Sequence, residues 1–394
     1  MENINFDKII ERKNTNCIKW DNLEQIFGKE NITPMWVADM DFKSSNDIIK
    51  ALSKRTEHGI FGYTKTSDEY YDVFINWIYK KHKWKIDKNW ISYVPGVVPG
   101  LKLAIYTYTK EKDNILIQTP VYYPFFNVIK NLNRNIVTNP LIYSDNIYSI
   151  DFKDLENKIK QYDVKMMILC NPHNPIGKVW SKDDLIKISN ICIDNDVLLI
   201  SDEIHSDLIY ENNKHEPIAN LNNNIKENSI TFYSPSKTFN IAGLQASNAI
   251  IPNEYLKKQF DETIEKIGNS MINALSQEAF IAAYKHGELW LEYLIKYLKE
   301  NINITIDFFN KEIPNSKIIT PEGTYLLWIN LKNIASEEEI KDILINKANI
   351  GLEEGSIFGE DGKGFFRMNI ATPKEILLKS LKKIKTSFKN GGLI

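Results

Sequence analysis

Cysteine is scarce in this sequence: three occur among 394 residues, at positions 17, 170 and 192. Their number is odd and they lie far apart, so neither a disulfide framework nor a metal-binding spacing can be built from them. Cys170 and Cys192 stand in apolar stretches, and we interpret both as small residues of a hydrophobic core. A disulfide-stapled secreted domain and a zinc module are therefore not expected.

The sequence also lacks a long apolar run and an excess of either charge. No apolar stretch approaches the length that spans a membrane, and the first residues, Met1–Asp7, are polar and acidic, unlike a secretory signal. Lys plus Arg number 49 and Asp plus Glu number 51, which gives no electrostatic reason to expect nucleic acid or an anionic membrane as a partner. These features predict a cytoplasmic enzyme.

Short apolar runs alternate with helical patterns between about residues 90 and 250. Runs such as Met166–Leu169 and Val197–Ile200 are continuously apolar, which is typical of strands that are covered on both faces. The expected strands are Trp90–Val94, Asn114–Gln118, Ile136–Thr138, Lys165–Cys170, Val197–Ser201, Ile230–Tyr233 and Ala246–Ile251. We therefore predict an α/β fold with a mostly parallel seven-stranded sheet between layers of helices.

Helical patterns lie between and after these strands. Ser181 and Asp184 form a capping box at the start of one helix, and residues 67–82 carry an amphipathic pattern. A long helical stretch runs from roughly 253 to 310.

The C-terminal part of the chain changes character. Strands are expected near 317–330, 349–353 and 364–371, separated by helical segments, which indicates a smaller α+β domain. We expect the first 45 residues to pack with it. The predicted division is a large domain over residues 46–290 and a small domain formed by residues 1–45 and 291–394.

Polar residues and glycines follow most of the expected strands. In a parallel sheet the ligand lies at the carboxyl ends of the strands, so these residues should share one rim. They are Gly96, Tyr122, Asn174, Asp202, His205, Ser234 and Lys237.

An amide, a carboxylate and a lysine come in order within the segments Asn171–Gly177, Ser201–His205 and Ser234–Gly243. A lysine can form a Schiff base with a carbonyl group, and a carboxylate can keep a pyridine nitrogen protonated. The set suits pyridoxal phosphate, with the phosphate at the loop Gly96–Gly100, where backbone N–H groups open a helix. Arg367, one of few arginines, suits bidentate binding of a carboxylate.

Each of these residues also has an ordinary interpretation. Lys237 alone could be a solvated lysine, Asp202 a helix cap and His205 a structural histidine, while Gly96 and Gly100 could mark a plain turn. The ordered combination favours the functional interpretation.

The combination resembles fold-type I pyridoxal-phosphate enzymes of the aminotransferase class I/II superfamily and, more narrowly, the MalY/PatB branch of cystathionine β-lyases. The segments that carry the resemblance are Pro34–Phe42, Phe61–Tyr63, Asn171–Gly177, Ser201–His205, Ser234–Gly243 and Phe358–Arg367. The segment Glu353–Ser356 departs from the Pro-Gly that is more common before the last of these, which leaves the path of that loop open.

The resemblance implies a role for each matching residue. Lys237 would be the Schiff-base lysine and the base for the Cα proton, and Asp202 would pair with the pyridinium nitrogen. Asn174 would bind the cofactor's 3-oxygen and contact the substrate, and His205 stands near that oxygen. Tyr122 would stack on the ring and take part in catalysis.

The remaining implied contacts involve the phosphate and the substrate. Val97, Val98 and the hydroxyl of Ser234 would bind the phosphate. Tyr63 would reach the phosphate of a neighbouring subunit, which implies a homodimer with shared sites. Arg367 and Ala38 would bind the substrate.

These residues do not by themselves select the reaction. The first hypothesis is a carbon–sulfur β-lyase that acts on cystathionine or related S-substituted cysteines. Alternatives are an amino-acid aminotransferase and a cofactor-binding regulatory protein with residual lyase activity. The Pro34–Phe42 segment and His205 favour the lyase by resemblance.

Overall fold

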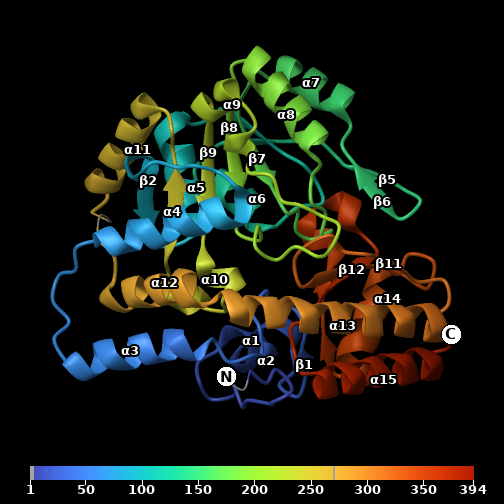
Figure 1. Ribbon diagram of the computed structural model, residues 1–394. Helices are drawn as coiled ribbons and strands as arrows, with labels where there is room; N and C mark the ends of the chain where they lie inside the picture. The colour runs from blue at the N-terminus through green and yellow to red at the C-terminus, as the bar shows by residue number, and fades with distance from the viewer. Residues whose placement is uncertain (1–3, 269–270) are drawn as a thin grey trace.

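Two larger β-sheets organise the computed structural model, which describes residues 4–268 and 271–394 (Figure 1). The first has seven strands in the order β2-β10-β9-β8-β7-β3-β4. Its strands are β2 Ile91–Val94, β3 Asn114–Ile117, β4 Asn135–Thr138, β7 Val164–Cys170, β8 Leu198–Asp202, β9 Ser229–Tyr233 and β10 Ser247–Ile250. Only β10 runs antiparallel to its neighbours in this sheet, so the predicted strands and the mostly parallel sheet are confirmed.

Side-chain alternation along the strands builds a core on each face of this sheet. Ile115 and Ile117 pack in one hydrophobic cluster, while Leu116 between them packs in another. The first face is covered by α5 Val97–Tyr108, α6 Pro124–Lys130 and α11 Glu254–Lys266, and the second by α7 Phe152–Gln161 and α8 Lys182–Asp194. Each fully buried Ile or Leu contributes about 1.5–3 kcal/mol to folding.

The two predicted helix caps are confirmed. Ser181 accepts a hydrogen bond from the backbone of Asp184 at 3.1 Å and caps α8, and Ser67 caps α4 Asp68–His82 in the same way. The helical stretch expected over 253–310 is divided into three helices, α11, α12 Ala274–His286 and α13 Glu288–Glu312. Gly287 lies between the last two, and a Cβ there would lie 2.3 Å from a ring carbon of Phe239, so the glycine allows close packing at this junction. Residues 269–270 of this stretch lie outside the described residues.

The second sheet is antiparallel, with the order β11-β12-β15-β14. Its strands are β11 Lys317–Ile319, β12 Leu326–Asn330, β14 Glu353–Glu354 and β15 Phe365–Asn369, accompanied by the helices α14 Glu337–Asp342 and α15 Lys374–Asn390. The short strand β1 Thr33–Pro34 pairs with β13 Ile350–Gly351, so the N-terminal segment joins this part of the molecule. The division into two domains stays a prediction, and its boundary at residue 290 would fall within α13.

The remaining elements are short or peripheral. They are α1 Ile18–Asp21, α2 Leu23–Phe27, α3 Asn46–His58, the hairpin β5 Ile142–Ser144 and β6 Ile147–Ser149, α9 Asn223–Glu227 and α10 Pro235–Thr238. In the part of the chain that the structure describes, no helix combines the length and the apolar character that a membrane crossing requires.

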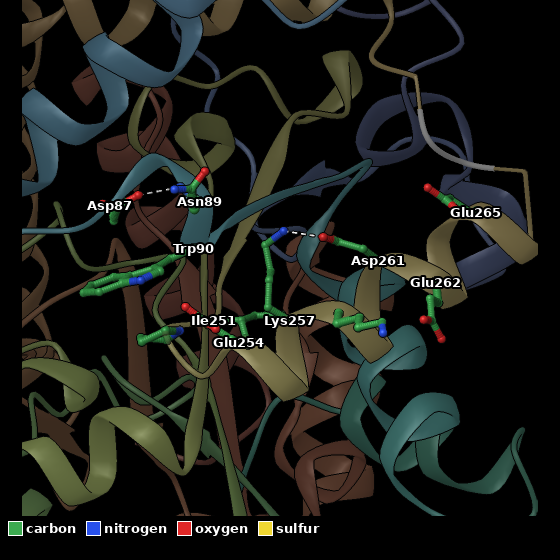
Figure 2. A pocket seen from close by; sticks show the side chains of 11 residues that line it. Asp87, Asn89, Trp90, Ile251, Glu254, Lys257, Asp261, Glu262 and Glu265 are labelled. Atoms are coloured by element: carbon green, nitrogen blue, oxygen red, sulfur yellow. Dashed lines mark hydrogen bonds and ion pairs between the residues drawn. The ribbon is translucent and has the colours of Figure 1, made fainter.

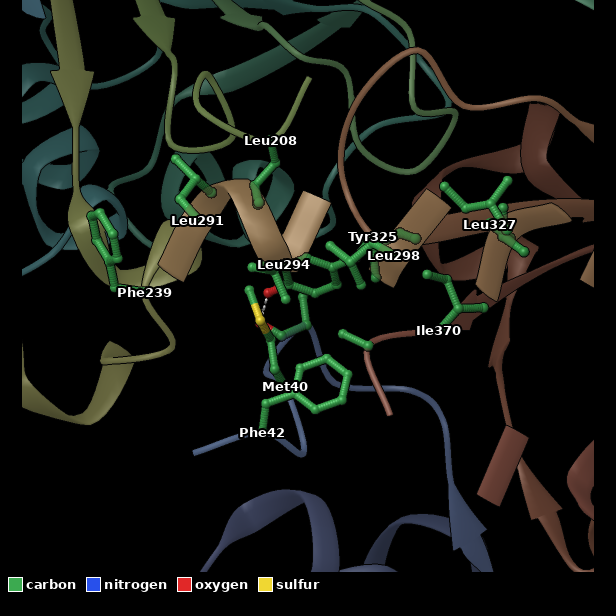
Figure 3. Close-up of a cluster of buried hydrophobic side chains, with 14 of the residues drawn as sticks. Met40, Phe42, Leu208, Phe239, Leu291, Leu294, Leu298, Tyr325, Leu327 and Ile370 are labelled. Atoms are coloured by element: carbon green, nitrogen blue, oxygen red, sulfur yellow. Dashed lines mark hydrogen bonds between the residues drawn. The ribbon is translucent and has the colours of Figure 1, made fainter. Parts of the chain in front are cut away.

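A hydrophobic cluster ties the N-terminal segment to both sheets. Figure 3 shows Met40 and Phe42 beside Leu294 of α13, with Tyr325 and Ile370 from the second sheet region next to them. All five side chains are buried. This packing fixes the residues just before Phe42 against the carboxyl edge of the large sheet.

Candidate active site

A cavity of about 180 Å³ opens at the carboxyl ends of β2, β7 and β8. Eight of the predicted site residues line it: Ala38, Val97, Val98, Tyr122, Asn174, Asp202, His205 and Lys237. Its remaining lining residues are Gly96, Pro99, Cys170, Ile204 and Ser236. Residues that are far apart in the sequence therefore lie together, as expected from the rule that the ligand of a parallel sheet lies at the carboxyl ends of its strands.

One end of the cavity is the start of α5. Gly96 precedes the helix and offers no side chain to cap it. The N–H groups of Val97 and Val98 belong to the first turn, where backbone N–H groups have no acceptor within the helix. Backbone donors and the helix dipole at this end suit a phosphate group. Gly100 has another purpose: a Cβ there would lie 2.4 Å from a ring carbon of Phe232, so this glycine lets α5 pack closely on β9.

Asp202 ends β8 with 3% of its surface exposed. Its carboxylate accepts one hydrogen bond, from the N–H of Ile204 at 3.1 Å. Burial raises the pKa of Asp202 to about 7, and the charge of Lys237 opposes this shift. A carboxylate so placed is stabilised by a cationic hydrogen-bond donor in the cavity.

Lys237 lies on α10, directly after the end of β9. Its Nζ donates to the carbonyl oxygen of Ala38 at 2.5 Å. Burial lowers the pKa of Lys237 to about 8. An appreciable fraction of the amine is then neutral near physiological pH, as a nucleophile or general base requires.

Arg367 lies on β15 and is 2% exposed. Its Nη1 donates to Oδ1 of Asn174 at 2.8 Å and its Nη2 to the carbonyl oxygen of Trp36 at 3.0 Å. Nη2 also forms an ion pair with Glu353. Its Nε has no hydrogen-bond partner among the described residues, which leaves a buried donor for a ligand. Sequence analysis missed Glu353 as a site residue, although it marked this segment as atypical.

His205 and Tyr122 contribute uncharged groups. Burial lowers the pKa of His205 to about 3, so its ring is neutral, and its Nδ1 has no partner among the described residues. Burial raises the pKa of Tyr122 above its usual value, so its hydroxyl keeps its proton.

Three predicted residues are not among those that line the cavity: Arg367, which reaches it through Asn174, and Ser234 and Tyr63. The hydroxyl of Ser234 donates to the carbonyl oxygen of Ala246 at 2.7 Å and accepts from the N–H of Ser236 at 3.2 Å. Ser236 is the serine that lines the cavity, a position next to Lys237 that sequence analysis passed over. Tyr63 is 98% exposed, beside a shallow apolar hollow that Phe61 and Met271 also line. The roles of Ser234 and Tyr63 stay predictions.

The segment Trp36–Phe42 forms a wall of the site, and side chains from distant parts of the chain hold its peptide carbonyls. The carbonyl of Trp36 accepts from Arg367, and those of Val37 and Asp39 accept from Asn369. The carbonyls of Met40 and Phe42 accept from Asn240. Sequence analysis singled out this segment by resemblance only, because its partners are long-range.

A buried carboxylate outside the cavity lining fixes the position of α10. Asp207 accepts hydrogen bonds from the indole N–H of Trp77 at 3.0 Å and the hydroxyl of Thr238 at 3.0 Å, and His82 lies 3.5 Å away. Thr238 is the neighbour of Lys237. Asp207 therefore links α4 to the helix that carries the lysine.

A larger, open hollow of about 640 Å³ lies beside β2 and α11 (Figure 2). Charged side chains of both signs line it, and Lys257 is paired with Asp261. None of the predicted site residues lines this hollow, and no group of three metal-ligating side chains occurs in the described ranges. Size alone therefore does not mark the functional cavity.

The residues of the smaller cavity fit pyridoxal 5'-phosphate. Asp202 supplies a buried acceptor that still requires a donor, Lys237 supplies an amine with a lowered pKa, and the start of α5 supplies donors for a phosphate. The cofactor's pyridine nitrogen, aldehyde and phosphate are the three groups that match these positions.

Comparisons with known proteins agree with this geometry. The family model described as aminotransferase class I and II matches residues 31–384. The chain is 40% identical to cystathionine β-lyase PatB of Bacillus subtilis over 385 residues, which cover 98% of this chain and 100% of that protein. It is 31% identical over 379 residues to protein MalY of Escherichia coli, covering 95% and 96% of the two chains. Cystalysin from Treponema denticola, whose crystal structure contains a pyridoxal 5'-phosphate cofactor, matches with a TM-score of 0.95 and 37% identity over 98% of this chain and 99% of that chain.

Proposed function

Because the chain belongs to the aminotransferase class I and II family, and within it to the MalY/PatB branch, we propose that it is a pyridoxal-phosphate-dependent carbon–sulfur β-lyase. Its substrates are cystathionine and related S-substituted cysteines. Elimination breaks the bond between Cβ and sulfur and releases a thiol. Water converts the remaining three-carbon unit to pyruvate and ammonia.

The juxtaposition of Lys237 and Asp202 in one buried cavity is the observation that carries this proposal. When bound, pyridoxal 5'-phosphate supplies a ring that accepts the electron pair left at Cα. Asp202 holds a proton on the ring nitrogen, because a buried carboxylate stabilises a cation beside it. Lys237 would hold the aldehyde of the cofactor, and its amine, whose pKa is near 8, would be the base for the Cα proton.

The other residues orient the cofactor and the substrate. Arg367 binds the substrate's α-carboxylate, supported by its free Nε and by Asn174 on Nη1. Tyr122 would pack against the cofactor's ring, and His205 would offer a neutral nitrogen to its 3-oxygen. The N–H groups of Val97 and Val98, with the hydroxyl of Ser236, would hold the phosphate, and Ala38 would border the substrate.

The same residues could also serve an aminotransferase, because proton removal from Cα is common to both reactions. The lyase is favoured because the relative PatB is named a cystathionine β-lyase and matches the whole length of the chain. Relatives named aspartate aminotransferase are less similar, at 25–26% identity.

Product analysis with cystathionine tests the proposal. Purified holoenzyme should release thiol and pyruvate in equal amounts without an added keto acid. The Lys237→Ala variant should lose this activity by at least about a thousandfold, since both the cofactor linkage and the base are removed. Amino-group exchange that requires a keto acid would instead identify an aminotransferase. Bound cofactor with neither reaction would favour a regulatory protein.

The proposal includes a homodimer with shared sites in the cytoplasm. Ile60, Phe61 and Tyr63 are exposed apolar or aromatic side chains on one segment, and Met271 is exposed beside the same hollow. Such a patch suits a subunit interface. All three cysteines are free, which fits a reducing compartment.

A further inference from the structure

The peptide carbonyl of Ala38 accepts hydrogen bonds from two side chains. Nζ of Lys237 donates to it at 2.5 Å, and the hydroxyl of Tyr325 donates to it at 2.8 Å. A carbonyl oxygen has two lone pairs, so these two donors use its accepting capacity. Ala38 and Lys237 line the candidate cavity, whereas Tyr325 is not among the lining residues. The proposed lyase mechanism gives Tyr325 no purpose.

Tyr325 is held firmly behind this wall of the cavity. It directly precedes β12, and its side chain is 1% exposed. Its own carbonyl accepts from the N–H of Ile370 at 3.1 Å, and the carbonyl of the preceding Thr324 accepts from the hydroxyl of Tyr210 at 2.6 Å. Burial raises the pKa of Tyr325 well above its usual value, so the phenol keeps its proton and stays a donor.

The carbonyls on either side of Ala38 are already in use. Those of Val37 and Asp39 accept from the side-chain amide of Asn369, each at 2.6 Å. The carbonyl between them is the one that accepts from Lys237. A lysine side chain is long and flexible, so its amine stays at one place in the cavity only where a fixed acceptor holds it.

We propose that Tyr325 is a positioning residue, whose hydroxyl fixes the Ala38 carbonyl and thereby holds the Lys237 amine in place for its bond to the cofactor's aldehyde. This inference rests on the proposed function, because it assumes that Lys237 forms this bond. In that step the amine nitrogen bonds to the aldehyde carbon, and the aldehyde oxygen leaves as water with the two hydrogens of the amine. Tyr325→Phe keeps the ring and removes the hydroxyl, so the amine should sample more positions and the step should slow.

Cofactor loading of the full-length protein tests the inference without turnover. After the cofactor is removed from the purified protein, the rate at which added pyridoxal 5'-phosphate forms its visible band measures the bond to Lys237. Tyr325→Phe should slow this step by about tenfold. Pyridoxine 5'-phosphate has a hydroxymethyl group in place of the aldehyde, so its Kd, measured by calorimetry, reports the pocket without the bond. This Kd should stay within about twofold of the wild-type value.

Turnover of the reloaded holoenzyme should show the same separation. With cystathionine, kcat of Tyr325→Phe should fall about tenfold and KM should stay near the wild-type value, because Arg367 is unchanged. Tyr108→Phe is the matched control: the Tyr108 hydroxyl donates to the carbonyl of Leu256 at 2.5 Å, between α5 and α11. This variant loses the same kind of hydrogen bond outside the cavity lining, so its loading rate and kcat should stay at wild-type values.

A wild-type loading rate in Tyr325→Phe would overturn the inference. Weakened binding of pyridoxine 5'-phosphate would also overturn it, including its complete loss in a variant that fails to fold, because the phenol would then support the pocket and not the lysine. Lys237→Ala identifies failure of the proposed function, since a visible band in this variant would show that the cofactor bonds to another residue. An aminotransferase would release no thiol from cystathionine and would still report the loading rates.

Discussion

At the scale of single residues, His173 shows how burial sets the acid sensitivity of the site. Its side chain is fully buried, with Nε2 2.8 Å from the carbonyl oxygen of Pro120 and with no described partner for Nδ1. Burial lowers the pKa of His173 to about 4. The residue sits between Asn171 and Asn174, so it supports the turn that aims Asn174 into the cavity.

We expect His173 to make the protein less stable in acid. Between pH 6.5 and about 4, an unfolded chain binds a proton at His173 that the folded chain does not, so the free energy of unfolding falls as the pH falls. The slope from one such proton is at most about 1.4 kcal/mol per pH unit. Chemical denaturation of His173→Gln across this range should give a shallower slope than wild type.

The exposed His286 provides the control for this measurement. His286→Gln should leave the wild-type slope unchanged. Equal slopes for wild type and His173→Gln would mean that His173 does not stay neutral in the folded protein.

At the scale of elements, the one-turn helix α10 depends on its neighbours for its position. It has only four residues, too few for a helix to be stable alone. The cap by Ser234 and the bond from Thr238 to Asp207 fix its two ends. The orientation of Lys237 therefore depends on contacts outside its own helix.

Asp207→Asn should change the orientation of Lys237 and leave the residues that bind the substrate in place. The amide cannot accept from both Trp77 and Thr238, so we expect a loss of about 1–3 kcal/mol of stability. kcat should fall about tenfold or more while KM changes little, because the base is misaligned but the substrate anchor is intact. The visible absorption of the bound cofactor should shift as well.

Thr238 separates this positioning role from a general structural one. Thr238→Ser keeps the hydroxyl and should retain wild-type kcat, whereas Thr238→Val should reproduce the defect of Asp207→Asn. The exposed Asp183→Asn serves as the charge control. Wild-type kcat in Thr238→Val would exclude the proposed link.

At the scale of the whole molecule, the exposed position of Tyr63 requires an explanation. It is 98% exposed in the single chain, and the family resemblance assigns it to the site of a neighbouring subunit. If two chains share their sites, two different inactive variants can complement each other within one dimer.

Mixing Tyr63→Ala with Lys237→Ala tests the shared site. Each hybrid dimer has one site with both residues intact and one with neither, so an equimolar, fully exchanged mixture should recover about a quarter of the wild-type sites. Lyase activity of the separate and mixed variants measures this. A mixture of Tyr106→Ala, another exposed tyrosine, with Lys237→Ala is the control. No gain on mixing Tyr63→Ala with Lys237→Ala would contradict shared sites.

Sequence analysis predicted the parts of the molecule that depend on local patterns. Continuously apolar runs such as Val197–Ile200 identified the strands, and the rule that ligands lie at their carboxyl ends brought Asp202 and Lys237 to one rim. The division of the helical stretch at Gly287 was not predicted, and the close approach of Phe239 to this glycine is a tertiary contact that no local pattern carries.

The supporting contacts of the site could not be predicted for the same reason. Glu353 meets Arg367 only through strand pairing, and Asp207 meets Thr238 across 31 residues. Ser236 was overlooked because the resemblance drew attention to Ser234. Residues that take part in the chemistry can be recognised from their type in the sequence, whereas residues that position them are identified only from contacts in the structure.

The wall formed by Trp36–Phe42 has a consequence for how the protein is made. Its peptide carbonyls are held by Asn240, Arg367 and Asn369, so this segment depends on partners that follow it in the chain by 200 to 331 residues. Asn369 must have been synthesised before all the hydrogen bonds of this wall can form. A chain cut before Arg367 lacks two of these three partners, so it should not retain the coenzyme.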